Sequence, residues 1–237
     1  MTPCATIALF IGSIRPLPES GRPTGIYKQP VHAPLALGPE GLAGDHQADR
    51  RVHGGRDKAV HLYPAGHYAR LAERFPAAAR LLLPGSLGEN LSTADLDEND
   101  ICLGDIWRLG HARLQLSQPR SPCWKIDERF GCDGMAQFIA EQRITGWYWR
   151  VVTPGAVCPG DTLALEESAP LACTLAEAML LWQAHRPPLA DLERLAASPG
   201  IADNWRQKIA NRIDWLRKNT DLTPPPVVAF HVKPENP

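Results

Sequence analysis

Hydrophobic residues in this chain come in short runs, and proline and glycine residues separate most of them. Runs of this length, bounded by turn-forming residues, are typical of β-strands and not of long helices. The segment 16–25 predicts one hairpin, and Gly110-His111 predicts the turn of another. Many short strands at fairly regular spacing, with helices inserted, predict a closed or nearly closed β-barrel. Extended segments are expected at residues 5–14, 26–31, 33–37, 101–109, 112–117, 147–152 and 162–165.

Two helices are predicted between these strands. Pro64 is well placed as the first residue of one helix, and Pro76 ends it, because proline cannot continue a helical hydrogen-bond ladder. Asp133 is placed to cap the second helix, whose apolar residues follow at helical spacing. The polar, glycine-rich segment 44–58 has no apolar period and is expected to be a loop.

The composition changes near Pro170. Thr174 and Glu177 form a capping box, and apolar residues then recur at helical spacing in three successive stretches. Three helices after a region of strands indicate a separate small helical domain. We expect this domain to be accessory, because it has no cluster of metal-ligating residues. The predicted organisation is a barrel domain at 1–168, a three-helix domain at 171–220 and a disordered, proline-containing tail at 221–237.

Composition and charge narrow the functional class. Hydrophobic residues make up 44 % of the chain, and the formal net charge of −1 favours neither a nucleic acid nor a membrane surface as partner. The third predicted helix carries basic residues, but acidic residues share it, so DNA binding is not expected. No apolar run approaches the roughly 20 residues of a membrane helix, and the N-terminus lacks a basic signal-peptide region. The six cysteines include no CxxC pair, so we expect a cytoplasmic protein with free thiols.

The stretch 117–125, with the sequence SQPRSPCWK, carries the first candidate chemistry. Its two prolines fix the backbone on either side of Arg120, so most of the segment is expected to be a rigid loop. Arg120 and Lys125 flank Cys123, and nearby positive charge lowers the pKa of a thiol. Cys123 is therefore a candidate nucleophile or metal ligand. The alternative is that Cys123 is a small apolar packing residue, as most free cysteines are.

Several short motifs occur in one order along the chain. They are GDHQAD at 44–49, HGG at 53–55, DKA at 57–59, GENL at 88–91, GD at 104–105 and SQPRSPC at 117–123. Together they resemble the MOSC proteins, named for the molybdenum cofactor sulfurase C-terminal domain. The resemblance is strongest to the YiiM-type members, which are linked to resistance against 6-N-hydroxylaminopurine. It runs through the third predicted helix and implies a MOSC β-barrel followed by a small three-helix domain.

The resemblance implies that Cys123 is the protein ligand of the molybdenum in a molybdopterin cofactor. A thiolate suits this soft metal, and the pterin phosphate calls for arginine, lysine and backbone N–H donors. Asp45 and Gln47 match the family pattern too, and we expect them to hold their loop in shape, whereas no site role is expected for His61. The predicted cofactor-binding residues are Arg120, Asn90, His53, Gly54, Gly55 and Lys58.

The function that the resemblance implies is reduction of N-hydroxylated compounds, such as hydroxylaminopurines and amidoximes, to amines. The cofactor carries the redox chemistry, and His53 is the candidate proton donor for the water that leaves. The sequence has no flavin, haem or iron–sulfur motif, so electrons would come from a separate reductase.

Other functions stay open at the level of sequence. Cys123 could carry a persulfide in a metal-free sulfur-transfer domain. It could also be a hydrolase-type nucleophile paired with His53, although no third residue that would orient the histidine is identified. A non-catalytic binding module is the remaining alternative if the Cys123 loop is buried.

Overall fold

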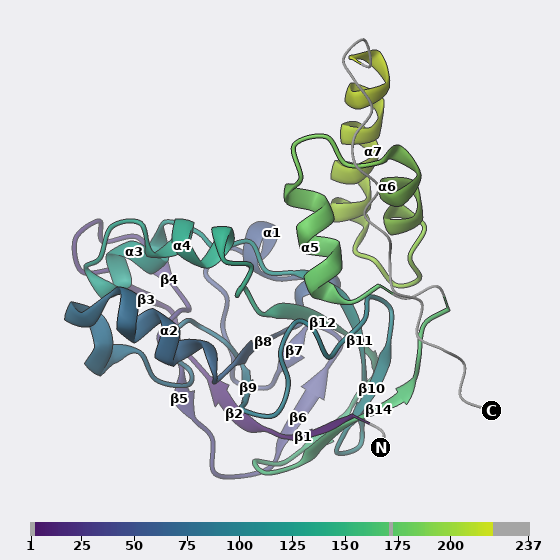
Figure 1. Cartoon of the computed structure of the whole chain (residues 1–237). Helices are drawn as coiled ribbons and strands as arrows, with labels where there is room; N and C mark the ends of the chain where they lie inside the picture. Colours follow the sequence, from purple (N-terminus) through teal and green to yellow (C-terminus); the bar gives the residue numbers. More distant parts are fainter. Residues whose placement is uncertain (1–2, 171–172, 220–237) are drawn as a thin grey trace.

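The computed structural model describes residues 3–170 and 173–219. The tail predicted at 221–237 lies outside the described residues. Figure 1 shows a strongly curled sheet with helices over one end of it and a helical unit projecting beyond. Among the described residues, no helix combines the length and the apolar character needed to cross a membrane.

The largest element is a nine-stranded sheet that curls into half a barrel. All neighbouring strands in it are antiparallel except one parallel pair, at 60–64 and 91–93. The predicted β-rich fold with inserted helices is therefore confirmed. From one edge to the other, the strands are β1 (Cys4–Thr6), β14 (Thr162–Glu167), β10 (Ile106–Leu109), β11 (Ala112–Pro119), β12 (Trp147–Thr153), β8 (Val60–Pro64), β9 (Leu91–Thr93), β2 (Ala8–Ile11) and β5 (Gln29–Pro30).

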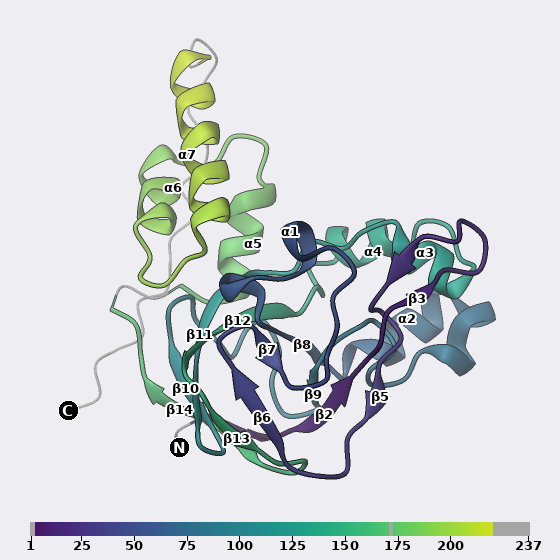
Figure 2. The same ribbon diagram turned by 180° about the vertical axis from the view of Figure 1, so that it is seen from behind.

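Two smaller sheets accompany the large one. The first pairs β13 (Gly155–Val157) with β6 (Leu35–Gly38) and β6 with β7 (Gly41–Leu42), and Figure 2 shows it from behind. The second is the hairpin of β3 (Arg15–Pro16) and β4 (Pro23–Thr24). This hairpin occupies the segment for which the proline and glycine content predicted one.

Three tryptophan side chains from β10 and β12 pack together in the main apolar core. Trp107, Trp147 and Trp149 are fully buried, and the ring of Trp149 meets the other two edge-on at centroid distances of 6.2 and 6.1 Å. Such T-shaped contacts add to the free energy gained by burying the rings. The hairpin of β10 and β11 turns at Gly110-His111, as predicted, with Leu109 opposite Ala112.

Two helix boundaries differ from the prediction. Pro64 does not begin a helix but ends β8, and α2 (His67–Arg74) starts three residues later. The fixed φ of proline is also compatible with the end of a strand. Helix α4 (Met135–Glu141) is not capped by Asp133. Its first backbone N–H groups donate instead to the Asp127 carboxylate, from Gly134 at 3.1 Å and Ala136 at 2.7 Å.

Short helices occur within and beside the two segments predicted to be loops, and also after α2. Within 44–58 lie α1 (Arg50–His53) and the 3₁₀ helix η1 (Arg56–Lys58). A second 3₁₀ helix, η2 (Pro76–Leu81), follows α2, and α3 (Lys125–Phe130) begins immediately after the Cys123 loop. These helices are too short to show a periodic apolar pattern in the sequence.

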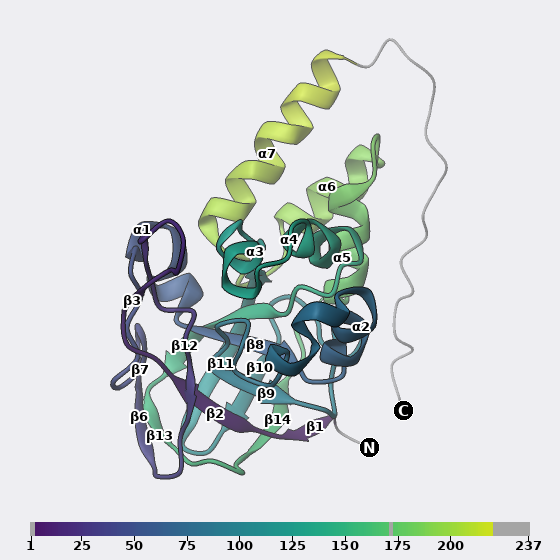
Figure 3. The ribbon, with the colours of Figure 1, turned by 90° about the vertical axis from the view of Figure 1, so that its left-hand side faces the viewer.

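The predicted three-helix region is present as α5 (Leu175–Gln183), α6 (Leu189–Ala196) and α7 (Asp203–Lys218). The capping box is confirmed, because Thr174 and Glu177 exchange side-chain and backbone hydrogen bonds at the start of α5. Figure 3 shows α7 leaning away from the sheet while α5 lies close to it. Buried residues of these helices and of the sheet belong to one continuous apolar cluster. The sheet before residue 170 and the helices after it thus share one apolar core.

Candidate functional site

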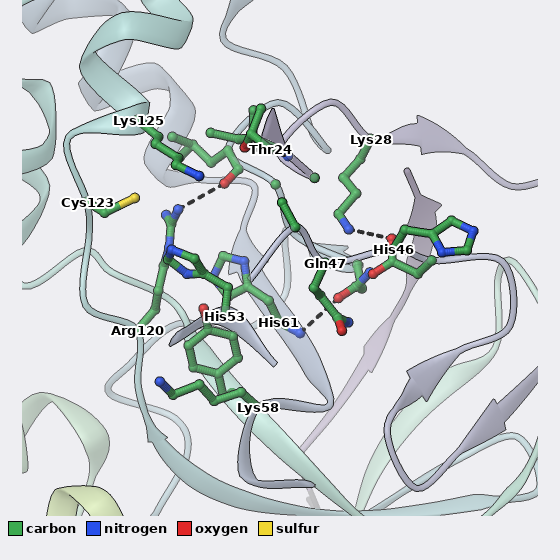
Figure 4. A pocket seen from close by; sticks show the side chains of 18 residues that line it. Thr24, Lys28, His46, Gln47, His53, Lys58, His61, Arg120, Cys123 and Lys125 are labelled. Atoms are coloured by element: carbon green, nitrogen blue, oxygen red, sulfur yellow. Dashed lines mark hydrogen bonds and ion pairs between the residues drawn. The ribbon is translucent and has the colours of Figure 1, made fainter. Parts of the chain in front are cut away.

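A pocket of about 630 Å³ gathers the residues of the sequence motifs. Its walls come from the loop after β4, the loop after β7, the α1–η1 segment, the turn before β9 and the loop after β11. Strands β8 and β12 contribute its floor through His61 and Tyr148. The predicted site residues that line it are Cys123, Arg120, His53, Asn90 and Lys58, and Figure 4 labels all of these except Asn90.

Gly54 and Gly55 connect α1 to η1 and are not among the residues that line the pocket. A Cβ atom on Gly54 would lie 3.1 Å from both the Cα of Arg50 and the Oε1 of Gln47. Gly55 has a φ of +86°, which favours glycine. Both glycines therefore allow the tight turn that places His53 and Lys58 on the same wall, while their contact with a phosphate stays a prediction.

Arg120 is held at both ends by backbone carbonyls. Its own N–H donates to the Gly146 carbonyl at 3.1 Å, and its Nη2 donates to the Leu87 carbonyl at 3.1 Å. The Nη1 atom is buried and has no hydrogen-bond partner among the described residues. An unpaired buried cationic donor is costly. A ligand with an anionic oxygen would satisfy it.

Cys123 is a free, half-buried thiol on the loop between β11 and α3. Figure 4 shows its sulfur on the same side of the pocket as the Arg120 guanidinium and the Lys125 side chain. The Lys125 ammonium donates to the Pro23 carbonyl at 2.8 Å, so it ties this loop to the β3–β4 hairpin. The thiol is therefore accessible from a cationic pocket and is not a core packing residue.

His53 is neutral at physiological pH in the free protein. Burial, the largest cause, and the charges of Arg120, Lys125 and Lys58 together lower its pKa from the ordinary 6.5 to about 4. The expected role of His53 as proton donor thus requires a change in the electrostatics of the pocket, such as the binding of an anion.

The lysines of the pocket differ in how their charge is balanced. Lys28 forms a buried ion pair with Asp45, whose Oδ1 also accepts the Gly12 N–H at 2.8 Å. Asp45 therefore has the structural role expected for it. The Lys58 ammonium lies 6.0 Å from the centre of the Tyr148 ring, and burial is the main cause that lowers the pKa of Lys58.

Asn90 is buried and connects β8 and β2, the two strands on either side of β9. Its Oδ1 accepts the His61 N–H at 3.2 Å, and its Nδ2 donates to the Phe10 carbonyl at 3.3 Å. Because a carboxamide has two donor hydrogens and two acceptor lone pairs, Asn90 can offer a ligand at most one of each. Contact of Asn90 with a pterin stays a prediction.

His61, Tyr148 and Lys28 line the pocket without having been predicted as site residues. The His61 and Tyr148 rings lie 5.2 Å apart, and burial followed by the charge of Arg120 lowers the pKa of His61 well below its ordinary value. The available signal was the single histidine within the otherwise apolar run Val60–Pro64. Its meaning depends on recognising that run as a strand.

Comparison with known proteins identifies the family. The sequence matches the MOSC domain over residues 49–164, and YiiM of Escherichia coli strain K12 is 37 % identical over 207 residues, which are 87 % of this chain and 91 % of YiiM. The chain belongs to the MOSC family. A crystal structure of E. coli YiiM is similar, with a TM-score of 0.75 and 30 % identity over 90 % of this chain and 93 % of that one, so this MOSC protein is of the YiiM type.

A more distant relative has a different overall organisation. A protein of Gibberella moniliformis named as a reductase is 36 % identical over 145 residues, which are 61 % of this chain but only 26 % of the fungal protein. A segment similar to part of this chain therefore also occurs within a much longer protein.

The pocket residues fit the cofactor that gives the MOSC family its name. Within the described residues, no three His, Cys, Asp or Glu side chains gather in a way that could hold a metal ion. A metal at Cys123 would therefore need most of its ligands from a cofactor, as a dithiolene provides. The unpaired Nη1 of Arg120 is a suitable partner for the phosphate of such a cofactor.

Proposed function

We propose that this MOSC protein is a molybdenum-cofactor-dependent reductase of N-hydroxylated compounds, including hydroxylaminopurines and amidoximes. The observation that carries the proposal is the presence of one accessible thiol, Cys123, in the same pocket as a buried arginine with an unpaired Nη1 atom. Membership of the YiiM-type MOSC proteins and the reductase name of the fungal relative support it.

In this proposal Cys123 binds the molybdenum, and Arg120 binds the anionic part of the pterin. When bound, the cofactor supplies the two electrons that break the N–O bond. The substrate R–NHOH also takes up two protons, so the products are R–NH₂ and water. Since the sequence has no motif for a second redox group, a separate flavin or iron–sulfur reductase would return the electrons.

The charge of the bound cofactor would also change the proton chemistry of the pocket. Arg120, Lys125 and Lys58 all contribute to lowering the pKa of His53. A phosphate or dithiolene anion offsets these cations and therefore raises that pKa toward neutrality. His53 would then be able to donate a proton to the leaving water.

The test begins with expression in a host that makes the cofactor, followed by measurement of molybdenum and pterin per chain. Reduction of 6-N-hydroxylaminopurine is then assayed with an artificial electron donor. Cys123→Ser should keep the fold but lose turnover, because a hard hydroxyl replaces a soft thiolate as metal ligand. The loss should exceed the roughly 10- to 100-fold that is typical when a residue that only hydrogen-bonds to a metal ligand is replaced. Cys132→Ser is the matched control, since Cys132 is also a free, half-buried thiol but does not line the pocket.

The proposal fails if Cys123→Ser reduces the substrate at the wild-type rate. It also fails if the purified chain holds no molybdenum but carries an extra sulfur on Cys123, detected by mass spectrometry. That second result would favour the sulfur-carrier function.

A further inference from the structure

The GENL motif at 88–91 contains a carboxylate that the proposed chemistry does not use. Glu89 is fully buried, and donors surround its two oxygens. Oε1 accepts the Tyr68 hydroxyl and the Gly85 N–H, each at 2.5 Å, and Oε2 accepts the Leu87 N–H at 3.1 Å. Two hydrogen bonds thus join the turn at 85–88 to one carboxylate, and a third joins that carboxylate to α2.

This turn also holds the guanidinium of Arg120. The carbonyl of Leu87 accepts Nη2 of Arg120 at 3.1 Å, and the N–H of the same residue donates to Glu89. Leu87 is fully buried and lies on the pocket wall. Glu89 and Arg120 are therefore connected through one residue, and neither side chain can move far without disturbing the turn.

The indirect connection has an electrostatic consequence. Within the described part of the chain, Arg120 forms no ion pair with an acidic side chain, whereas Lys28 in the same pocket is paired with Asp45. A carboxylate bound directly to the guanidinium would cancel most of its attraction for an anion. A carbonyl orients the guanidinium without removing its charge.

We propose that Glu89 is a positioning residue for anion binding: it fixes the Leu87 carbonyl, which holds the Arg120 guanidinium at the pocket wall, where its charge attracts an anionic ligand. The inference rests on the proposed function insofar as the ligand is the cofactor phosphate. It predicts that Glu89 affects anion affinity only through Arg120.

Glu89→Gln is the informative change, because it keeps the size of the side chain but replaces one of the two acceptor oxygens with an NH₂ group. Its amide group must face a backbone N–H or the Tyr68 hydroxyl, so the turn loosens. Inorganic phosphate is titrated into the metal-free, full-length protein, and pterin retained per chain is measured in parallel. We expect a loss of phosphate affinity of about tenfold for Glu89→Gln, and of about 10- to 100-fold for Arg120→Ala.

The double variant separates positioning from general destabilisation. If Glu89 acts through Arg120, then Glu89→Gln causes no further loss of affinity in the Arg120→Ala background. If Glu89→Gln instead destabilised the protein independently of Arg120, its loss of affinity would add in full to the loss caused by Arg120→Ala. Asp191→Asn is the matched control, since Asp191 is a buried carboxylate on α6 that pairs with Arg194, and it should leave phosphate affinity unchanged.

Tyr68→Phe provides a second test if Glu89→Gln does not fold. It removes the hydroxyl that donates to Glu89 and also accepts the Leu87 N–H at 3.3 Å, so both of these hydrogen bonds are lost. A smaller loss of affinity, again absent without Arg120, is expected. The role of Glu89 would be overturned if Glu89→Gln and Tyr68→Phe bound phosphate as tightly as the wild type. It would also be overturned if their losses of affinity added to that of Arg120→Ala. Neither result would affect the proposed function. Equal affinity in Arg120→Ala and wild type would instead overturn the anion-binding role in the proposed function.

Discussion

Arg120, Lys28 and Lys125 all line the pocket, but of these three only Arg120 has a buried side-chain nitrogen without a partner among the described residues. Lys28 is neutralised by Asp45, and Lys125 donates to the Pro23 carbonyl. Arg120 is bound by carbonyls, and its Nη1 has no partner among the described residues. The strongest electrostatic attraction for an anion is therefore expected at Arg120, on the side of the pocket where Cys123 lies.

The pKa of His53 is sensitive to the positive charge of the pocket. Its pKa is lowered from the ordinary 6.5 to about 4, so the folded state binds fewer protons than the unfolded state within that window. His53 consequently contributes less stability as the pH falls from 6.5 to 4. Sulfate, which keeps its charge over this range, should raise the pKa of His53 by offsetting the surrounding cations.

Nuclear magnetic resonance of the His53 ring, assigned with a His53→Gln variant, measures this change. The ring of His111 serves as control, because it lies in the β10–β11 turn outside the pocket and should not respond to sulfate. A His53 pKa that stays near 4 at saturating sulfate would contradict an anion site beside it.

The sequence predicted the residues of the site better than their contacts. Cys123, Arg120, His53, Asn90 and Lys58 do line one pocket. Their roles as ligands were inferred from family resemblance and stay predictions. Which cations are already paired could not be read from the sequence, because such pairs as Lys28 and Asp45 depend on how distant loops pack. The buried partners of Glu89 were hidden for the same reason.

At the scale of elements, those with a local sequence signal, such as a turn or a capping box, were predictable. Elements that form only because neighbouring strands pack against them were not. The β10–β11 hairpin and the capping box of α5 have local signals, and both are present. Strand β8 was not predicted, because every residue in it is buried and it shows no alternation. It is stabilised by its neighbours, β12 on one side and β9 on the other.

The β3–β4 hairpin is the element whose position bears most directly on the pocket. Its loop donates two backbone N–H groups to Glu128 of α3, from Glu19 at 3.0 Å and Ser20 at 2.7 Å. The hairpin then runs directly into residues 24–26, which line the pocket. Hydrogen bonds from Ser20 are the main cause that lowers the pKa of Glu128, so these contacts weaken as the pH falls through that lowered value.

Glu128→Ala should loosen the hairpin while leaving the sheet intact. We expect faster hydrogen exchange at the amides of Glu19 and Ser20, since both lose their acceptor. Glu141→Ala is the control, because Glu141 is exposed and its carboxylate accepts a hydrogen bond from Gln137 of its own helix, not from the hairpin. Unchanged exchange at both amides would show that other contacts hold the hairpin.

At the scale of the molecule, the C-terminal helices are connected to the site through the turn before β12. The N–H of Ala176 in α5 donates to the Glu98 carbonyl at 2.8 Å. The buried Glu98 carboxylate accepts the Gly146 N–H at 2.8 Å, and the Gly146 carbonyl accepts the N–H of Arg120. The helical unit therefore supports the backbone end of Arg120, while Glu89 supports its guanidinium end.

The same helices also complete the core, so we expect a chain that ends at Ser168 to lose both stability and cofactor. Buried residues of α5, α6 and α7 form one apolar cluster with those of the sheet. Because a domain is stable by only roughly 5–15 kcal/mol, exposure of the apolar side chains that these helices cover should destabilise the remaining sheet. Circular dichroism melting and pterin content per chain measure the outcome against the full-length protein.

A graded version of this experiment keeps the chain complete. Gly104 precedes β10 with a φ of +84°, and a Cβ atom there would lie only 2.2 Å from the Pro199 carbonyl oxygen, between α6 and α7. Gly104→Ala should push the helical unit from the sheet, lower the melting temperature and reduce pterin retention, though less than truncation does. Gly160→Ala is the matched control, because its φ of +86° imposes similar backbone strain while its Cβ would meet no atom within 4 Å. If the chain ending at Ser168 melts cooperatively and keeps its full pterin content, the helices are accessory in the strict sense, and Arg120 is positioned by the sheet alone.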